Sequence, residues 1–119
     1  DELVITQEDE HRYTAALERN GFFGPDSWYM NGDANTAYAN KVKSNWRLNM
    51  PVLFLHAAND QVCETLKSRL ADPMREHCPD FSETIVKSGH WMAQEKPIDV
   101  NAALAKWLAA KFPGLWPAG

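Results

Sequence analysis

The stretch that most constrains the fold is an apolar run that begins after Pro51. Residues 52–57 read VLFLHA, and their apolar side chains follow one another without the alternation of a strand that has one wet face. Such a continuous run is typical of a strand covered on both faces, as in parallel sheets. We therefore predict a buried β-strand here. We interpret His56 within it as a buried histidine whose ring is hydrogen-bonded.

A second strand and two helices follow this run. Residues 82–86 are predicted to form the second strand, and residues 62–71 a helix between the two strands. Pro97 begins an amphipathic helix, which Pro113 ends. The order strand, helix, strand, helix is that of an α/β layer with parallel strands.

Two strands alone do not make a stable buried parallel sheet. The strand at residues 52–57 is apolar on both faces and needs a neighbour on each edge. We therefore expect these 119 residues to be the C-terminal part of a larger α/β domain. Its other strands would lie upstream or on another polypeptide, and the isolated chain would expose strand edges and aggregate.

The N-terminal part has a helical pattern. Thr6 is a predicted N-cap, and Asp9 three residues later resembles a capping box. The helix is expected over residues 7–20 and ends at Gly21. A short helix with Trp28 and Tyr29 should follow, and then a helix or loop over residues 34–46.

Composition and charge exclude several classes of protein. The net charge is −4 and no lysine or arginine cluster exists, which argues against a nucleic-acid partner. No apolar run approaches the roughly 18–20 residues of a membrane span. The start, Asp1 to Val4, has neither Met nor a secretory signal and looks like the interior of a longer chain, so it says little about location. We predict a cytoplasmic protein. Cys63 and Cys78 are interpreted as free thiols. No metal site is expected, because the four histidines are scattered and no HExxH or CxxC spacing is present.

Two residues at the predicted strand ends carry chemistry. Asp60 and His90 each follow a strand, at the edge where open α/β sheets bind ligands. An acid that accepts a hydrogen bond from imidazole orients the ring, and this order along the chain is that of α/β-hydrolases. The alternatives are a helix N-cap for Asp60 and a structural role for His90. No two glycines have the spacing of a nucleophile elbow, so the chain carries at most the acid and base of a triad.

Three segments resemble the soluble-type epoxide hydrolases of the α/β-hydrolase fold. Residues 21–31, which read GFFGPDSWYMN, look like a segment of their cap domain. Residues 51–60 resemble the strand that ends in the triad acid. Residues 88–91, followed by residues 95–97, resemble the loop of the catalytic histidine. The resemblance extends over residues 5–108, and the cap segment is its most specific part.

The resemblance implies a domain division and a mechanism. Residues 1–48 would be the end of the helical cap and the return to the core, and residues 49–119 the C-terminal part of the core. In such enzymes an aspartate opens the epoxide and forms a covalent ester, which a histidine-activated water hydrolyses. By position, Tyr29 matches a cap tyrosine that donates to the epoxide oxygen, His90 the base and Asp60 the orienting acid. The nucleophile and the second tyrosine would lie upstream of Asp1.

The implied substrate is a small apolar epoxide, and the implied protein partner is the missing N-terminal part of the hydrolase domain. Neither a metal nor an organic cofactor is required, and a homodimer is left open. Trp28, Val62 and Trp91 flank the implied catalytic positions and either line an apolar substrate pocket or simply pack. The alternative role for Tyr29 is that of an aromatic residue packed within the cap. Trp46 is expected in the core.

Other functions remain open at this stage. Another cap-bearing α/β-hydrolase, such as a haloalkane dehalogenase or an esterase, would share the acid and the base. An upstream serine would favour the esterase, and a dehalogenase would lack the tyrosine pair. A non-catalytic fragment that binds an apolar ligand is an alternative of another class. In every case we expect the 119-residue chain to be inactive alone.

Overall fold

The computed structural model describes residues 4–115 and divides into two compact units. The first unit is Asp1–Trp46 and the second is Arg47–Gly119. Each is described by itself below. Asp1 to Leu3, which belong to the segment that carries no secretory signal, lie outside the described residues.

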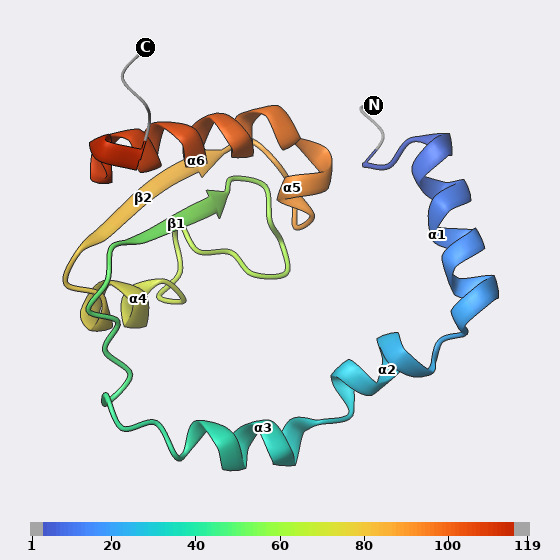
Figure 1. Cartoon of the computed structure of the whole chain (residues 1–119), viewed down its shortest axis with the longest axis horizontal. Helices are drawn as coiled ribbons and strands as arrows, with labels where there is room; N and C mark the ends of the chain where they lie inside the picture. Colours follow the sequence, from blue (N-terminus) through green and yellow to red (C-terminus); the bar gives the residue numbers. More distant parts are fainter. Residues whose placement is uncertain (1–3, 116–119) are drawn as a thin grey trace. The chain divides into compact units, whose positions relative to one another are not determined.

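Helix α1 (Gln7–Asn20) of the first unit has the predicted bounds and the predicted cap (Figure 1). The Thr6 hydroxyl accepts a hydrogen bond from the backbone N–H of Asp9 at 3.1 Å. In return the Asp9 carboxylate accepts one from the backbone N–H of Thr6 at 2.9 Å. Gly21 ends the helix with φ of 69°, a conformation that glycine adopts without steric cost. The helix predicted over residues 7–20 is confirmed.

Two shorter helices follow, α2 (Phe23–Tyr29) and α3 (Gly32–Ala39). Helix α3 ends at Ala39, and the positive φ angles of Asn45 and Trp46, 50° and 66°, show that residues 45 and 46 are not helical. The side chain of Trp46 is 54% exposed. The prediction that Trp46 belongs to the core is therefore wrong.

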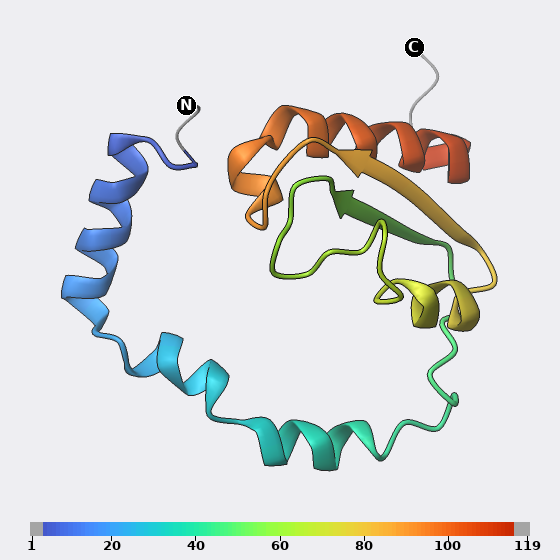
Figure 2. The same cartoon turned by 180° about the vertical axis from the view of Figure 1, so that it is seen from behind.

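The second unit is built on two parallel strands, β1 (Val52–Ala57) and β2 (Phe81–Val86). Their register runs from Val52 opposite Phe81 to Ala57 opposite Val86. Both predicted strands are confirmed, the second beginning one residue earlier than expected, but the predicted burial of β1 is not: only His56 is buried, and the other residues of the strand are half-buried. The strands therefore end together, at the same edge of the sheet (Figures 1 and 2).

Helices lie on both sides of this sheet. Helix α6 (Pro97–Lys111) runs along one side and contacts both strands. Helix α4 (Asp72–His77) lies on the other side, and α5 (Met92–Glu95) leads into α6 (Figures 1 and 2). A short 3₁₀ helix, η1 (Pro113–Leu115), follows α6. Within residues 4–115, β1 pairs with β2 alone, as expected for a part of a larger α/β domain.

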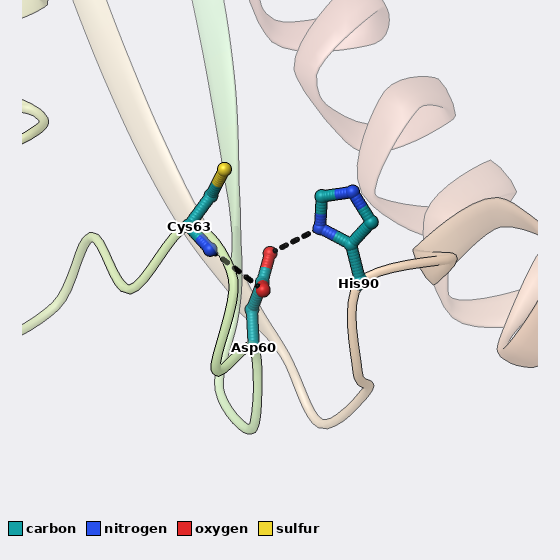
Figure 3. Close-up of side chains that lie close together, drawn as sticks. All are labelled: Asp60, Cys63 and His90. Atoms are coloured by element: carbon teal, nitrogen blue, oxygen red, sulfur yellow. Dashed lines mark hydrogen bonds and ion pairs between the residues drawn. The ribbon is translucent and has the colours of Figure 1, made fainter.

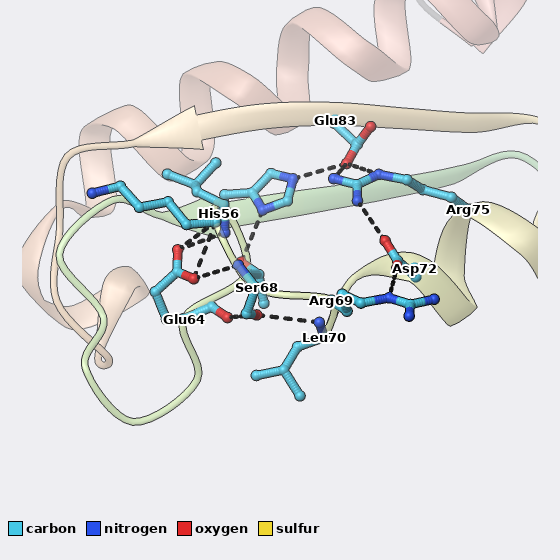
Figure 4. A network of polar contacts seen from close by, with 11 residues as sticks. His56, Glu64, Ser68, Arg69, Leu70, Asp72, Arg75 and Glu83 are labelled. Atoms are coloured by element: carbon cyan, nitrogen blue, oxygen red, sulfur yellow. Dashed lines mark hydrogen bonds and ion pairs between the residues drawn. The ribbon is translucent and has the colours of Figure 1, made fainter.

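His56 is buried and hydrogen-bonded through both ring nitrogens. Its side chain is 2% exposed; Nδ1 lies 2.8 Å from Thr65 Oγ1 and Nε2 lies 3.0 Å from Glu83 Oε1. Arg75 Nη2 donates to the same Glu83 oxygen at 2.6 Å, and Arg75 also pairs with Asp72 (Figure 4). The predicted role of His56 is confirmed, and the network ties β1 and β2 to α4.

The helix predicted over residues 62–71 does not form. The Glu64 carboxylate instead accepts hydrogen bonds from the backbone N–H groups of Leu66, Lys67 and Ser68 at 2.7–3.0 Å (Figure 4). A side chain that binds nearby backbone donors in this way competes with the helical ladder. The segment between β1 and α4 is therefore a loop made of turns and bends.

No helix in the part of the chain that the structure describes combines the length and apolar character needed to cross a bilayer.

Candidate active site

Asp60 and His90 meet just beyond the ends of β1 and β2. The distance from His90 Nδ1 to Asp60 Oδ2 is 2.9 Å (Figure 3). These two residues, called the acid–base pair below, are 30 positions apart in the sequence. The parallel register brings them together, because strands that end at one edge place their following loops side by side.

Backbone hydrogen bonds fix the two loops to each other. Beyond the end of β1, the N–H of Ala58 donates to the carbonyl of Val86 at 2.9 Å. The N–H of Asn59 donates to the carbonyl of Ser88, also at 2.9 Å. Ser88 is only 2% exposed. The ladder between the strands thus continues to the residue before Asp60, and the pair sits on a rigid base.

The Asp60 carboxylate is buried and held by backbone donors. The residue is 8% exposed, and its Oδ1 accepts hydrogen bonds from the N–H groups of Val62 at 2.8 Å and Cys63 at 2.9 Å. The Cys63 N–H and the hydrogen bond to His90 lower the pKa of Asp60 below its ordinary 3.8, and burial opposes this only in part. The carboxylate is therefore ionised at neutral pH, with Oδ2 directed at the imidazole.

The other ring nitrogen of His90 is the one available to a reactant. An ionised carboxylate only accepts hydrogen bonds, so in the neutral ring Nδ1 carries the proton and Nε2 is basic. Figure 3 shows Nε2 on the side of the ring away from Asp60. The side chain of His90 is 41% exposed, and its ring meets that of Trp91 edge to face at 5.5 Å. The arrangement can accept a proton and stabilise the resulting imidazolium.

The remaining predicted site residues lie in two places. Val62 and Trp91 adjoin the acid–base pair, and their side chains are 73% and 65% exposed. Trp28 and Tyr29 lie on α2 in the first unit, where both are also largely exposed. The structure thus brings Val62 and Trp91 to the pair, whereas Trp28 and Tyr29 belong to the unit that is described separately.

Glu95 holds the loop of His90 and was not predicted. Its carboxylate accepts hydrogen bonds from the backbone N–H of Gly89 at 2.6 Å and of Trp91 at 3.2 Å. A Cβ atom at Gly89 would lie 2.9 Å from Glu95 Oε1, so a larger residue there would displace the Glu95 carboxylate. The only sign of this contact in the sequence is that Glu95 belongs to the segment that resembles a histidine loop.

Cys63 also lies at the site and was not predicted there. One donor atom from each of Asp60, Cys63 and His90 can be chosen so that all three lie within 4.8 Å of one another (Figure 3). The Cys63 side chain is exposed, while the other thiol, Cys78, is buried. Both are free, as expected. No motif of neighbouring residues in the sequence indicates this cluster, because it is the fold that brings His90 close to Asp60 and Cys63.

Known proteins provide an independent comparison. No protein-family model matches the chain. It is 33% identical over 106 residues to Epoxide hydrolase A of Mycobacterium tuberculosis, an alignment that covers 87% of this chain and 32% of that protein. It is 31% identical over 106 residues to Bifunctional epoxide hydrolase 2 of Sus scrofa, covering 88% of this chain and 18% of that protein.

A third relative, Epoxide hydrolase B of Mycobacterium tuberculosis, is 32% identical over 111 residues, which is 92% of this chain and 31% of that protein. The chain thus spans from 18% to 32% of the length of these relatives. The two parallel strands and their helices agree with a partial α/β-hydrolase fold. Over about nine tenths of its length this chain is similar to epoxide hydrolases, and its architecture is that of the C-terminal part of an α/β-hydrolase fold.

Proposed function

We propose that this chain is the part of an epoxide hydrolase that carries the base, the orienting acid and one cap tyrosine. The observation that carries the proposal is the hydrogen bond of 2.9 Å between His90 Nδ1 and Asp60 Oδ2 at the carboxyl edge of the sheet. The relatives reported above are named epoxide hydrolases, which favours this reaction over dehalogenation or ester hydrolysis.

In the first step, an aspartate outside this chain attacks a carbon of the epoxide ring. A carbon–oxygen bond of the ring breaks as the ester bond forms, and the ring oxygen gathers negative charge. Tyr29 donates a proton to this oxygen through its phenol O–H, which acts as a general acid. A donor positioned where charge develops lowers the barrier by a few kcal/mol, about 3–4 in measured cases.

In the second step, His90 Nε2 takes a proton from a water molecule that attacks the ester carbonyl. The ionised carboxylate of Asp60, which faces Nδ1 at 2.9 Å, stabilises the imidazolium that forms. The tetrahedral intermediate expels the diol oxygen, which takes the proton back from His90. The nucleophile is left as an aspartic acid and releases its proton to solvent, while the tyrosinate takes one proton up from solvent. The net reaction adds one water molecule to the epoxide.

In this scheme the nucleophile lies outside the chain. We propose that the chain is inactive alone and becomes active when it is joined to the upstream part of the hydrolase domain. The exposed apolar side chains of Val62 and Trp91 beside the pair are suited to an apolar substrate. Trp28, adjacent to Tyr29, would contribute from the cap. A cytoplasmic location and a homodimer remain predictions from the sequence.

The test is diol formation from a styrene-oxide-like substrate, measured for the chain alone and for the chain joined to its upstream region. We expect turnover by the joined protein alone. Parallel assays with a haloalkane and an aryl ester distinguish the neighbouring hydrolase activities. Turnover by the 119 residues alone would contradict the missing nucleophile. A folded joined protein that hydrolyses only the haloalkane or the ester would overturn the proposed function.

A further inference from the structure

We propose that Asp60, Cys63 and His90 form a binding site for Zn²⁺ that blocks the acid–base pair. The three side chains come from two loops and surround one point beside the Asp60 carboxylate (Figure 3). Nothing in the epoxide-opening scheme uses the Cys63 thiol. That scheme therefore does not explain why Cys63 lies next to both Asp60 and His90.

The donor set matches the chemistry of zinc. A thiolate sulfur, an imidazole nitrogen and a carboxylate oxygen are the three kinds of protein ligand that Zn²⁺ takes. The Cys63 thiol loses its proton when the ion binds, as zinc-bound cysteines do. Thiolate and carboxylate together then balance the double positive charge of the ion, and the imidazole binds in its neutral form. The occupied site carries no net charge.

The geometry requires only small shifts of the three donor atoms. Zinc at about 2.0–2.1 Å from nitrogen and oxygen and about 2.3 Å from sulfur separates tetrahedral ligands by about 3.3–3.6 Å. The three donor atoms already lie within 4.8 Å of one another, and the closest contact of the pair is 2.9 Å. The Cys63 backbone is fixed to Asp60 Oδ1 by its N–H at 2.9 Å. To close the site, the exposed Cys63 side chain rotates toward the pair, and if the ion binds Nδ1, His90 Nδ1 and Asp60 Oδ2 move apart by about 0.4 Å.

The ion can reach the site and would stop the proposed chemistry there. Cys63 and His90 are exposed to solvent, so a fourth position remains for water. If the ion binds Nδ1 of His90, it replaces the hydrogen bond to Asp60. If it binds Nε2, it takes the lone pair that would accept the proton of water. The inhibition rests on the proposed function, whereas binding of the ion does not.

The experiment is a calorimetric titration of the protein that carries this chain with Zn²⁺ alone, without substrate. We expect one saturable site. Loss of a residue that merely supports a metal ligand weakens binding by about 10- to 100-fold, so Cys63→Ser, which removes a ligand, should weaken it at least as much. Cys78→Ser changes the buried thiol outside the cluster and should leave the affinity unchanged. Cys63→His restores a nitrogen ligand and should recover much of the loss.

Cobalt provides a second readout that does not depend on activity. Co²⁺ in place of Zn²⁺ should give a thiolate-to-metal absorption that is present in the Cys78→Ser variant and lost in Cys63→Ser. Zinc affinity that is equal in the folded wild type and in Cys63→Ser would overturn the site, as would the absence of saturable binding. Cys63-dependent binding in a protein without epoxide turnover would leave the metal site standing and reject the proposed function.

Discussion

Glu95 and Gly89 are joined by a hydrogen bond of 2.6 Å, from the Gly89 backbone N–H to the Glu95 carboxylate, one residue before His90. The other carboxylate oxygen accepts from the Trp91 N–H at 3.2 Å, one residue after it. One side chain thus holds the peptide groups on both sides of His90. Because Glu95 touches neither the His90 ring nor Asp60 in these bonds, we infer that it positions the base.

Glu95→Gln tests this positioning role. The amide has one oxygen to accept a hydrogen bond, so one of the two backbone donors loses its partner. Hydrogen bonds to charged groups contribute about 1.5–3 kcal/mol, and we expect the free energy of unfolding to fall by a comparable amount. In the complete enzyme kcat should fall with little change in KM, because the base is misplaced while the substrate surface remains. Glu95→Asp should recover part of kcat.

Glu76→Gln is the matched control, since Glu76 is an exposed glutamate on α4 in the same unit. It should change neither kcat nor the free energy of unfolding. If Glu95→Gln behaves like Glu76→Gln in both measurements, Glu95 has no positioning role.

Tyr29→Phe tests the proposed proton donor. Removal of one donor at a developing negative charge costs about 10²–10³ in kcat in measured cases, and a loss of this order is expected for the complete enzyme. Tyr38→Phe on α3 is the matched control, because Tyr38 is 76% exposed and Tyr29 is 82% exposed. Steady-state kinetics of both variants on one epoxide provide the comparison. Equal activity in the two variants would remove Tyr29 from the proposed mechanism.

The acid stability of the second unit should depend on Glu83. The hydrogen bond from Arg75 is the main cause that lowers the pKa of Glu83 below its ordinary 4.5, and His56 contributes in the same direction. A carboxyl group with a lowered pKa in the folded state stabilises it above the unfolded value, and this stability is lost as the pH falls through the lowered pKa. Stability should therefore fall as the pH drops below 4.5.

Urea unfolding at neutral pH and below pH 4.5 measures this effect. The Glu83→Gln variant should be less stable than the wild type at neutral pH and should lose less stability on acidification. Glu18→Gln, an exposed substitution on α1, should keep the wild-type dependence. An identical acid dependence in Glu83→Gln and wild type would show that the bonds to Arg75 and His56 contribute nothing.

The strands and the acid–base contact could be predicted from local pattern and topology. The apolar run at Val52–Ala57 predicts a strand, and β2 is short, parallel and in register with it. Once two parallel strands end together, residues that follow them closely must lie near each other. The topology therefore predicts that Asp60 and His90, 30 positions apart, lie close together, and the hydrogen bond between them confirms this contact. Their chemical role is the one proposed above.

The loop between β1 and α4 could not be predicted in the same way. Val62, Leu66 and Leu70 have helical spacing, and periodicity alone favours a helix. Whether a helix forms here depends on the hydrogen bonds that the Glu64 carboxylate makes. It accepts hydrogen bonds from three backbone N–H groups that a helix would use. The approach of Cys63 to His90 and the reach of Glu95 to Gly89 are likewise side-chain contacts, which residue spacing does not specify.

The most direct test of the acid–base assignment is the mass of the complete enzyme after incubation of its His90→Gln variant with an epoxide. We expect that the aspartate still opens the ring while the ester is no longer hydrolysed. The protein mass should then rise by that of one epoxide molecule, and diol formation should cease. His11→Gln, an exposed change on α1, should turn over normally without an adduct. A folded His90→Gln enzyme that shows no adduct, or that forms diol at the wild-type rate, would contradict the account.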